Sequence, residues 1–385
     1  MMNFAFGTPS SIIFGAGTME QQLGAQVKKL NGSRVFILTD PGIAKVGILE
    51  KVQQILKKEG FEVGVYDQVV PEPPIETVDK IAEEVKDNAY DLLVGLGGGS
   101  AMDVTKVVSI LVTNGGSARD YTGSDKIKKP GLPTIMLPTT AGTGSEVTKI
   151  AIFSFPEEEV KKGIVSPHLF ATAAIVDPSL TYKLPPNLTA YTGMDAFIHA
   201  AESYISKNAN KFTEGLSLIA IDLIAKNLRT AVSDGDNAEA RYNMSLGSLI
   251  AGIAFGNAGV GAVHAMAYPL GGQFHLPHGL ANTLMLRYVM EYNVVSCLDK
   301  FAVIAEAMGE NTEGLSVREA AFKAIEAMIN LAKDTNVPTR LRDVNIPKEA
   351  IPKMAAAGIN ETRLLSNNPR KLTQKDLEDI YTNAW

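Results

Sequence analysis

LLVGLGGGSAMDVTK, residues 92–106, is the stretch that decides the fold. Leu92–Leu96 is a candidate strand, the three glycines that follow make a tight turn, and SAMDVTK opens a helix. Backbone N–H groups of such a turn, together with a helix N-terminus, bind phosphate well. The stretch therefore predicts a phosphate cradle, although it lacks the G-x-G-x-x-G fingerprint and a plain tight turn remains an alternative.

Two polar residues of this stretch have more than one possible role. Ser100 is a candidate cap for the helix and a candidate phosphate contact. Asp103 lies at the capping-box position for Ser100, so a purely structural role is as consistent with the sequence as a contact with a bound ligand.

Short β-rich runs alternate with amphipathic helical patterns throughout the first half of the chain. The candidate strands are Arg34–Thr39, Phe61–Tyr66, Leu92–Leu96, Thr134–Leu137 and Ala173–Val176, with Ile12–Phe14 as an edge strand. Helical patterns cover Gly47–Glu59 and Ile75–Asn88, and Val147–Phe155 is predicted to pair with Gly163–Val165 as a hairpin. This β-α-β rhythm predicts an α/β domain with a mostly parallel, Rossmann-like sheet.

The chain changes character after Leu184, where Pro185 and Pro186 interrupt it. The predicted helices are Leu188–Ile205, Lys211–Val232, Glu239–Tyr268, Ala281–Val294, Leu298–Met308 and Val317–Asp334, with short helices near Ile351 and Lys375. We therefore predict a dinucleotide-binding α/β domain over residues 1–184 and an all-α domain for metal and substrate over residues 185–385. A cleft between two domains is a common place for a small-molecule site.

The bulk composition excludes several classes of protein. A length of 385 residues fits two domains, and 45% hydrophobic with 20% charged residues is typical of a soluble globular chain. The net charge of −6 and the lack of a long basic block argue against a nucleic-acid partner. Cys297 is the only cysteine, so no internal disulfide forms. No signal peptide is evident, and we expect a cytoplasmic protein.

One long segment could be mistaken for a membrane span. Tyr242–Leu286 contains no Asp, Glu, Lys or Arg. Its glycines, prolines and histidines are instead typical of a tightly packed core, so we expect no membrane partner.

A second loop and one carboxylate add to the predicted cradle. Leu137–Thr148 follows a strand and is dense in glycine and hydroxyl side chains. Two such loops at the carboxyl ends of a sheet flank one crevice, which favours a dinucleotide. Asp40 ends the strand sequence ILTD and is placed to bind an adenosine ribose and to repel a 2′-phosphate, which favours NAD over NADP. Alternatively, it is a turn residue before Pro41.

Four residues of the second half have ligand types and spacings that suit a metal ion. Asp195 and His199 are four apart and lie on one helical face. His264 is expected on a second helix and His278 in the turn that follows it. One carboxylate and three imidazoles suit Fe(II), Zn or a similar divalent ion. Four unrelated polar residues are the alternative, but unpartnered histidines would be costly in such apolar surroundings.

These motifs resemble those of the iron-containing (group III) alcohol dehydrogenases over essentially the whole chain. The matching segments are GGGSAMDVTK, PTTAGTGSEVT, GMDAFIHAAESY and GNAGVGAVHAMAYPLGGQFHLPHG. That family includes lactaldehyde reductases and 1,3-propanediol dehydrogenases. The resemblance implies a dinucleotide-binding domain like that of dehydroquinate synthase, followed by a helical metal domain.

The resemblance also implies specific site residues. The metal ligands would be Asp195, His199, His264 and His278. The nucleotide contacts would be Asp40, Gly97, Gly98, Gly99, Ser100, Thr139, Thr140, Thr143 and Ser145. Lys161, or its neighbour Lys162, would lie near the nicotinamide ribose. Phe255 falls where an aromatic residue lines the substrate channel, and plain helix core is an equal alternative.

The proton path departs from the family pattern. Many relatives carry a histidine one helical turn after the third ligand, where this chain has Tyr268. A phenol titrates near pH 10 and is a poorer base than imidazole at neutral pH. His275 lies three residues before His278, and it either takes part in proton transfer or forms a hydrogen bond within its loop. Tyr268 and His275 are thus the candidate proton-path residues.

The resemblance implies an NAD-linked dehydrogenase of a short primary alcohol or diol, in which a divalent ion coordinates the substrate oxygen as a Lewis acid. It also implies a homodimer or a larger homo-oligomer. One rival is a zinc enzyme like glycerol dehydrogenase, which uses fewer protein ligands. A non-redox metal-dependent lyase or hydrolase is a weaker rival, because it would need no nucleotide crevice.

Overall fold

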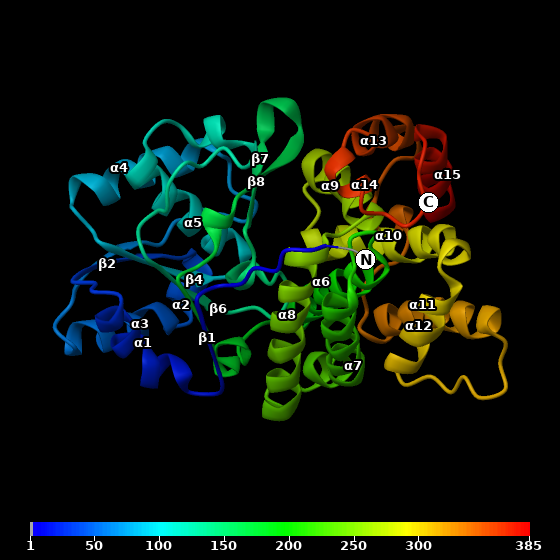
Figure 1. The fold of residues 1–385 in the computed structure, drawn as a ribbon, viewed down its shortest axis with the longest axis horizontal. Helices are drawn as coiled ribbons and strands as arrows, with labels where there is room; N and C mark the ends of the chain where they lie inside the picture. The colour runs from blue at the N-terminus through cyan, green and yellow to red at the C-terminus, as the bar shows by residue number, and fades with distance from the viewer. Residues whose placement is uncertain (1–2) are drawn as a thin grey trace. The chain divides into compact units, whose positions relative to one another are not determined.

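The computed structural model describes residues 3–385, which divide into two compact units (Figure 1). The sheet unit comprises Gly7–Lys183, and the helical unit comprises residues 3–6 together with Leu184–Trp385. Within the helical unit, Phe6 packs edge-on against Phe212, with ring centroids 4.6 Å apart, so the start of the chain joins the helices.

A six-stranded sheet forms the centre of the sheet unit, with strand order β1-β9-β6-β4-β2-β3. The strands are β1 (Ser11–Phe14), β2 (Arg34–Leu38), β3 (Glu62–Tyr66), β4 (Leu92–Gly97), β6 (Thr134–Pro138) and β9 (Ala173–Val176). All neighbouring pairs are parallel, as predicted, so the carboxyl ends of the strands lie along one edge of the sheet. The predicted edge strand at Ile12–Phe14 is present as β1.

Helices cover both faces of this sheet because each face is apolar. The helices are α1 (Thr18–Lys29), α2 (Pro41–Lys45), α3 (Ile48–Lys58), α4 (Glu76–Asp87) and α5 (Gly99–Asn114). Leu23 of α1 and Leu56 of α3 belong to one buried core, which includes Val35 and Val94 of the sheet. α4 and α5 contribute to a second core that contains Phe36 and Leu93. Adjacent strand residues thus point to opposite faces.

A smaller sheet carries the predicted hairpin. β7 (Ile150–Phe155) and β8 (Val160–Val165) pair antiparallel, and β5 (Gly123–Ser124) adds to β8. The first arm begins at Ile150 rather than at Val147, because Ser145–Val147 forms a 3-10 turn after Gly144, whose φ is 59°.

The helical unit is built from ten α-helices among the described residues. They are α6 (Pro186–Ile205), α7 (Lys211–Ser233), α8 (Ala238–Ala258), α9 (Ala262–Phe274), α10 (His278–Asn293), α11 (Leu298–Ala307), α12 (Val317–Asp334), α13 (Ile351–Gly358), α14 (Thr362–Leu365) and α15 (Gln374–Ala384). α6 packs against α7, α8 and α10. Short 3-10 turns connect several of the remaining elements.

The predicted single helix Glu239–Tyr268 is wrong. The chain breaks between α8 and α9 at Gly259–Gly261, and the two helices meet at 103°. Gly259 has a φ of 77°, a value that favours glycine. Among residues 3–385 no single helix is long and apolar enough to cross a membrane, and only this bent pair together meets that criterion. His278, predicted in a turn, is instead the first residue of α10 after Pro277.

Candidate metal centre and nucleotide cradle

The glycine-rich turn joins the end of β4 to the start of α5. Gly97 ends the strand with a φ of 148°, which favours glycine. Gly98 is the N-cap and α5 starts at Gly99, one residue before Ser100. The predicted cap is therefore wrong: Ser100 already lies in the first turn, where its hydroxyl accepts a hydrogen bond from the backbone N–H of Glu72 at 3.2 Å.

The second loop lies against this turn. The N–H of Thr139 donates to the carbonyl oxygen of Gly97 at 3.0 Å. A Cβ atom on Gly98 would lie 3.6 Å from the Thr140 side chain, and one on Gly99 would lie 2.9 Å from that of Thr143. The structure therefore brings the two predicted loops together at the edge where β4 and β6 end.

Two buried hydroxyls at this edge support a ligand. The side-chain oxygens of Thr39 and Thr140 are buried and have no hydrogen-bond partner in the described chain. A buried polar atom without a partner costs free energy, and a bound polar ligand would supply one. The glycine turn, the start of α5 and these hydroxyls together fit the phosphates and ribose hydroxyls of a dinucleotide.

Asp40 has the predicted turn role, whereas its contact with an adenosine ribose remains a prediction. It is the N-cap of α2, and its Oδ1 accepts hydrogen bonds from the N–H groups of Gly42 at 2.8 Å and Ile43 at 3.1 Å. Its Oδ2 lies 3.2 Å from the point where a Cβ of Gly97 would stand. Oδ1 therefore has the predicted turn role, and Oδ2 is directed towards the glycine turn.

Asp103 ties α5 to the second loop through one carboxylate oxygen and to β7 through the other. Oδ1 accepts from the Ser145 hydroxyl at 2.5 Å, and Oδ2 accepts from the Ile152 N–H at 2.9 Å. Lys106, which sequence reasoning did not identify, donates to the Ser145 hydroxyl at 2.6 Å and the Ile150 carbonyl at 2.8 Å. Burial raises the pKa of the Asp103 carboxyl and lowers the pKa of the Lys106 ammonium. These contacts hold the loop, and direct nucleotide contacts of Asp103 and Ser145 remain predictions.

Lys161 and Lys162 have different environments on β8. Lys161 is buried and donates to Glu72 at 2.5 Å, whereas the more exposed Lys162 pairs with Glu158. Because the N–H of Glu72 also donates to Ser100, Lys161 is linked to the glycine turn through one residue. This favours Lys161 over Lys162 for the predicted contact with the nicotinamide ribose.

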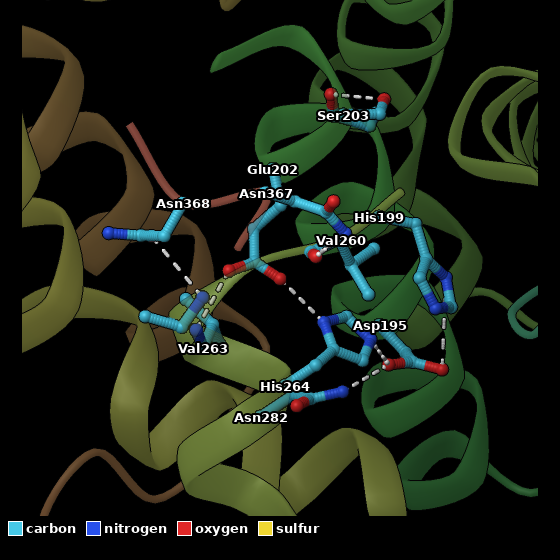
Figure 2. A network of polar contacts seen from close by, with 12 residues as sticks. Asp195, His199, Glu202, Ser203, Val260, Val263, His264, Asn282, Asn367 and Asn368 are labelled. Carbon is cyan, nitrogen blue, oxygen red and sulfur yellow. Dashed lines mark hydrogen bonds and ion pairs between the residues drawn. The ribbon is translucent and has the colours of Figure 1, made fainter. Parts of the chain in front are cut away.

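The four candidate metal ligands converge in the helical unit. Asp195 and His199 lie one turn apart on α6, His264 lies on α9 and His278 starts α10. One ligand atom from each lies within 4.8 Å of every other. Asp195 is central: its carboxylate oxygens are 4.0 Å from His199 Nδ1, 3.9 Å from His264 Nε2 and 3.8 Å from His278 Nε2. Figure 2 shows Asp195, His199 and His264 turned towards one another.

Close packing of two helices creates this convergence. A Cβ atom on Gly279 would lie 2.0 Å from the carbonyl oxygen of Tyr191 on α6. Only glycine lets the start of α10 approach α6 so closely, and this approach places His278 beside Asp195.

The site's electrostatics fit a cation. The Nε2 atom of His264 is buried and has no hydrogen-bond partner in the described chain. Burial alone would raise the pKa of the Asp195 carboxyl, but His199, His278, His264 and the Asn282 amide hold it below its usual value. The separations of 3.8 to 4.0 Å are too long for hydrogen bonds. They are close to the roughly 3.4 Å expected between tetrahedral ligands about 2.1 Å from a metal. One carboxylate and three imidazoles therefore fit a divalent first-row ion.

Sequence reasoning missed two buried partners of these ligands. The Asn282 amide donates to Asp195 Oδ1 at 2.7 Å, and Glu202 Oε2 lies 2.6 Å from His264 Nδ1. Glu202 and His264 are 62 residues apart, so no local spacing connects them. The sequence signal for Glu202 was a glutamate three residues after His199 in a largely apolar helical stretch.

The remaining candidate residues, for the substrate channel and the proton path, differ in their exposure to solvent. Phe255 is buried, and its ring stacks on His199 with centroids 4.1 Å apart. Tyr268 is buried, with its ring centroid 6.1 Å from that of His278. His275 is exposed and ends α9 in a left-handed conformation with a φ of 56°. Both alternatives for His275, and the proton path, remain predictions.

Comparisons with known proteins place both halves of the chain in one family. Residues 9–178 match the family model for iron-containing alcohol dehydrogenase, and residues 189–385 match that for the C-terminal part of the Fe-containing alcohol dehydrogenase family. A long-chain-alcohol dehydrogenase 1 from Geobacillus thermodenitrificans is 43% identical over 374 residues, covering 96% of this chain and 94% of the relative.

Solved structures also align with this chain over its whole length. A 1,3-propanediol oxidoreductase aligns over 100% of both chains, with a TM-score of 0.97 and 39% identity. A sulfoacetaldehyde reductase from Bifidobacterium kashiwanohense, solved in complex with NAD+, aligns over 100% of this chain and 99% of its own, with a TM-score of 0.90 and 30% identity. The chain therefore belongs to the iron-containing alcohol dehydrogenase family, whose members are oxidoreductases that use NAD and iron.

Proposed function

We propose that the protein transfers hydride between a short primary alcohol or diol and NAD, with Fe(II) held by Asp195, His199, His264 and His278. The observation that carries the proposal is the convergence of these four ligand atoms within 4.8 Å of one another. One of them, the buried Nε2 of His264, has no hydrogen-bond partner among the described residues. Zn or another divalent metal is the alternative, because the same donor set accepts several first-row ions.

The helical unit supplies the metal chemistry. A divalent cation held there provides Lewis acidity, which lowers the pKa of an alcohol and polarises a carbonyl. Asp195 supplies negative charge, and its hydrogen bond from Asn282 fixes the orientation of the carboxylate. Phe255 packs on His199 and helps to keep that ring in place. We infer that Phe255 also limits the space for substrate beside the cation.

The sheet unit supplies the cofactor site. NAD provides the hydride acceptor, and NADH the donor in the reverse direction. The turn Gly97–Gly99 lets a pyrophosphate approach the backbone. The hydroxyls of Thr39 and Thr140, which have no hydrogen-bond partner within residues 3–385, supply hydrogen bonds. Asp40 would accept from the adenosine ribose through Oδ2 and disfavour NADP.

The substrate that we propose is a small primary alcohol or diol. The relatives named above act, by their names, on long-chain alcohols, on 1,3-propanediol and on sulfoacetaldehyde. The buried Phe255 against His199 favours a small substrate over a long chain. We also propose a homodimer or a larger homo-oligomer, for which family membership is the support. The oligomeric state is testable by light scattering coupled to size-exclusion chromatography.

The experiment is an NADH oxidation assay with short aldehydes and an NAD reduction assay with short alcohols and diols, after anaerobic reconstitution with Fe(II) or Zn. A long-chain alcohol and sulfoacetaldehyde are assayed separately as alternative substrates. We expect turnover with small primary substrates only in metal-loaded protein. No redox activity with any substrate in loaded, nucleotide-binding protein would refute the proposal and favour a lyase or hydrolase.

The variant His264→Ala tests the proposed metal site. It removes one ligand from α9, and we expect loss of retained metal and of turnover. NADH binding should persist, because the cradle residues belong to the sheet unit. Full activity in metal-free His264→Ala would contradict the proposed site. Metal analysis after anaerobic purification also separates this proposal from a zinc enzyme of the glycerol dehydrogenase type.

A further inference from the structure

Glu202 is a buried carboxylate with two separate partners on one neighbouring segment. It lies on α6, three residues after His199, and only 2% of it is exposed. Oε2 lies 2.6 Å from His264 Nδ1, and Oε1 accepts from the backbone N–H of Val263 at 2.7 Å. Figure 2 shows Glu202 between the start of α9 and the His264 ring, on the side of the ring away from Asp195. One side chain thus holds the ring of a candidate ligand and the backbone of the residue before it.

The segment that Glu202 holds is the break between α8 and α9. Here the amide of Asn367 donates to the carbonyl oxygen of Val260 at 2.9 Å, and Asn368 Oδ1 accepts from the N–H of Ala262 at 3.3 Å. Asn368 also exchanges two hydrogen bonds with Asn293. Side-chain bonds therefore replace the helical bonds that the break removes, and they hold the chain directly before His264.

The chemistry of a carboxylate determines which nitrogen of His264 is available. An ionised carboxylate only accepts hydrogen bonds, so a proton lies on Nδ1 when the ring pairs with Glu202. The neutral ring then carries its lone pair on Nε2, the atom 3.9 Å from Asp195 Oδ1 and without a hydrogen-bond partner in the described chain. Such an outer carboxylate fixes both the tautomer and the orientation of a ligating imidazole.

We propose that Glu202 is a positioning residue of the metal centre, which presents His264 Nε2 to the cation by bonding the Nδ1 side of the ring and the Val263 backbone together. This inference rests on the proposed metal site and deepens it. It assigns to Glu202 no contact with the substrate, the cofactor or the cation.

Glu202→Gln is the decisive variant because it preserves shape and removes the second acceptor. If the amide oxygen accepts from Val263, the amide NH₂ faces His264 Nδ1 and forces the proton onto Nε2, which then cannot ligate. If the amide oxygen of residue 202 faces the His264 ring instead, the amide NH₂ faces the backbone N–H of Val263. Two hydrogen-bond donors then oppose each other. Either arrangement weakens the site. Glu202→Asp keeps the charge, but it is one methylene shorter and cannot retain both bonds.

Ser203→Ala is the matched control on the same helix. Ser203 is also fully buried, and its hydroxyl bonds that of Ser217 at 2.7 Å, away from the metal ligands (Figure 2). Its removal therefore reports the effect of losing a buried hydrogen bond on α6 without a change at His264.

The measurements are the Zn(II) dissociation constant, by competition with a chelating indicator, and the thermal midpoint of the metal-free protein. We expect Glu202→Gln to weaken Zn(II) binding about 10- to 100-fold and Glu202→Asp to weaken it less. We expect Ser203→Ala to lower the thermal midpoint with Zn(II) affinity within about twofold of wild type. The readout requires no turnover.

A folded Glu202→Gln protein with wild-type Zn(II) affinity would overturn the inference, even if its thermal midpoint falls, because Glu202 would then serve stability alone. If neither Glu202 variant folds, the residue serves folding, and the inference is also overturned. Failure of the wild-type protein to bind Zn(II) or Fe(II) would instead refute the proposed function, so the two failures are distinguishable.

Discussion

Asp40 and Gly97 meet at the carboxyl ends of two neighbouring strands, where a carboxylate oxygen of Asp40 lies 3.2 Å from the position of a Cβ atom on Gly97. β2 and β4 pair in parallel, with Leu38 opposite Gly95, which brings the two residues to the same edge. Capping of α2 uses Oδ1, so Oδ2 is the oxygen beside the glycine turn. The residue predicted to select the nucleotide is therefore adjacent to the predicted phosphate cradle.

Asp40→Asn should relax the preference for NAD. An amide does not repel a 2′-phosphate, so we expect kcat/KM with NADPH to rise about tenfold, which corresponds to about 1.4 kcal/mol. Asparagine retains the capping oxygen, and stability should change little. Asp40→Gly is the companion variant, and it should act in the same direction. Unchanged NADPH kinetics in both variants would mean that Asp40 does not read the ribose.

Gly98→Ala should weaken NADH binding without unfolding the protein. Gly98 has a φ of −79°, which alanine adopts readily, and the new Cβ would make an ordinary contact 3.6 Å from Thr140. We expect a stability change within about 0.5 kcal/mol. The methyl group fills space that a phosphate needs, so the NADH dissociation constant should rise about tenfold, measured by fluorescence titration. Gly215→Ala, at an exposed helical glycine with open space around it, is the control.

Asp103→Asn should destabilise the protein by about 3 kcal/mol, because it leaves the buried Lys106 ammonium without its carboxylate. Urea unfolding measures the loss. Lys106→Met in the Asp103→Asn background removes the uncompensated charge and should recover part of the stability, which a double-mutant cycle quantifies. Equal stabilities of the single and double variants would show that the ion pair is not the cause. NADH affinity should also fall, because an amide at residue 103 cannot accept from both the Ser145 hydroxyl and the Ile152 N–H.

Local patterns predicted the parts of the fold and of the sites that depend on neighbouring residues. Alternating short strands and helices predicted the parallel sheet, and the glycines after Leu96 predicted the turn. The spacing of Asp195 and His199 predicted a shared helical face, and both lie on α6. The glycine and hydroxyl composition of the second loop predicted its place beside the turn.

The errors arose where local patterns carry no information. In the uncharged stretch around Gly259 the apolar periodicity continues through the glycines, so it did not reveal the break between α8 and α9. Ser100 was predicted as the cap, but it is the second residue of α5, two positions after the actual N-cap Gly98. Glu202, Asn282 and Lys106 were missed because each bonds residues far away in the sequence, and only the folded chain brings them together.

Glu146→Gln should change how stability depends on pH. Burial raises the pKa of the Glu146 carboxyl from its usual 4.5 to about 7. The folded protein therefore holds this proton more tightly than the unfolded chain, and between pH 4.5 and 7 the contribution of Glu146 to stability falls as pH rises. The loss is complete above about pH 7 and amounts to about 3 kcal/mol at most.

The glutamine variant cannot ionise, so its advantage over the wild type should grow from pH 5 to pH 8. Urea unfolding at several pH values measures this difference. A difference that is constant with pH would mean that Glu146 ionises normally in the folded protein.

Tyr268→Phe and His275→Asn should separate the two candidate proton paths. Tyr268 is buried beside His278, whereas His275 is exposed at the end of α9. Asparagine tolerates the left-handed conformation of residue 275, so this variant removes the imidazole without straining the loop. We expect kcat for alcohol oxidation to fall about tenfold or more in Tyr268→Phe and to stay within about twofold of wild type in His275→Asn. Equal metal content in both variants is the necessary control, because Tyr268 lies next to a ligand. The reverse pattern would place the path through the loop, and unchanged kcat in both would leave water and the ribose hydroxyl as the route for the proton.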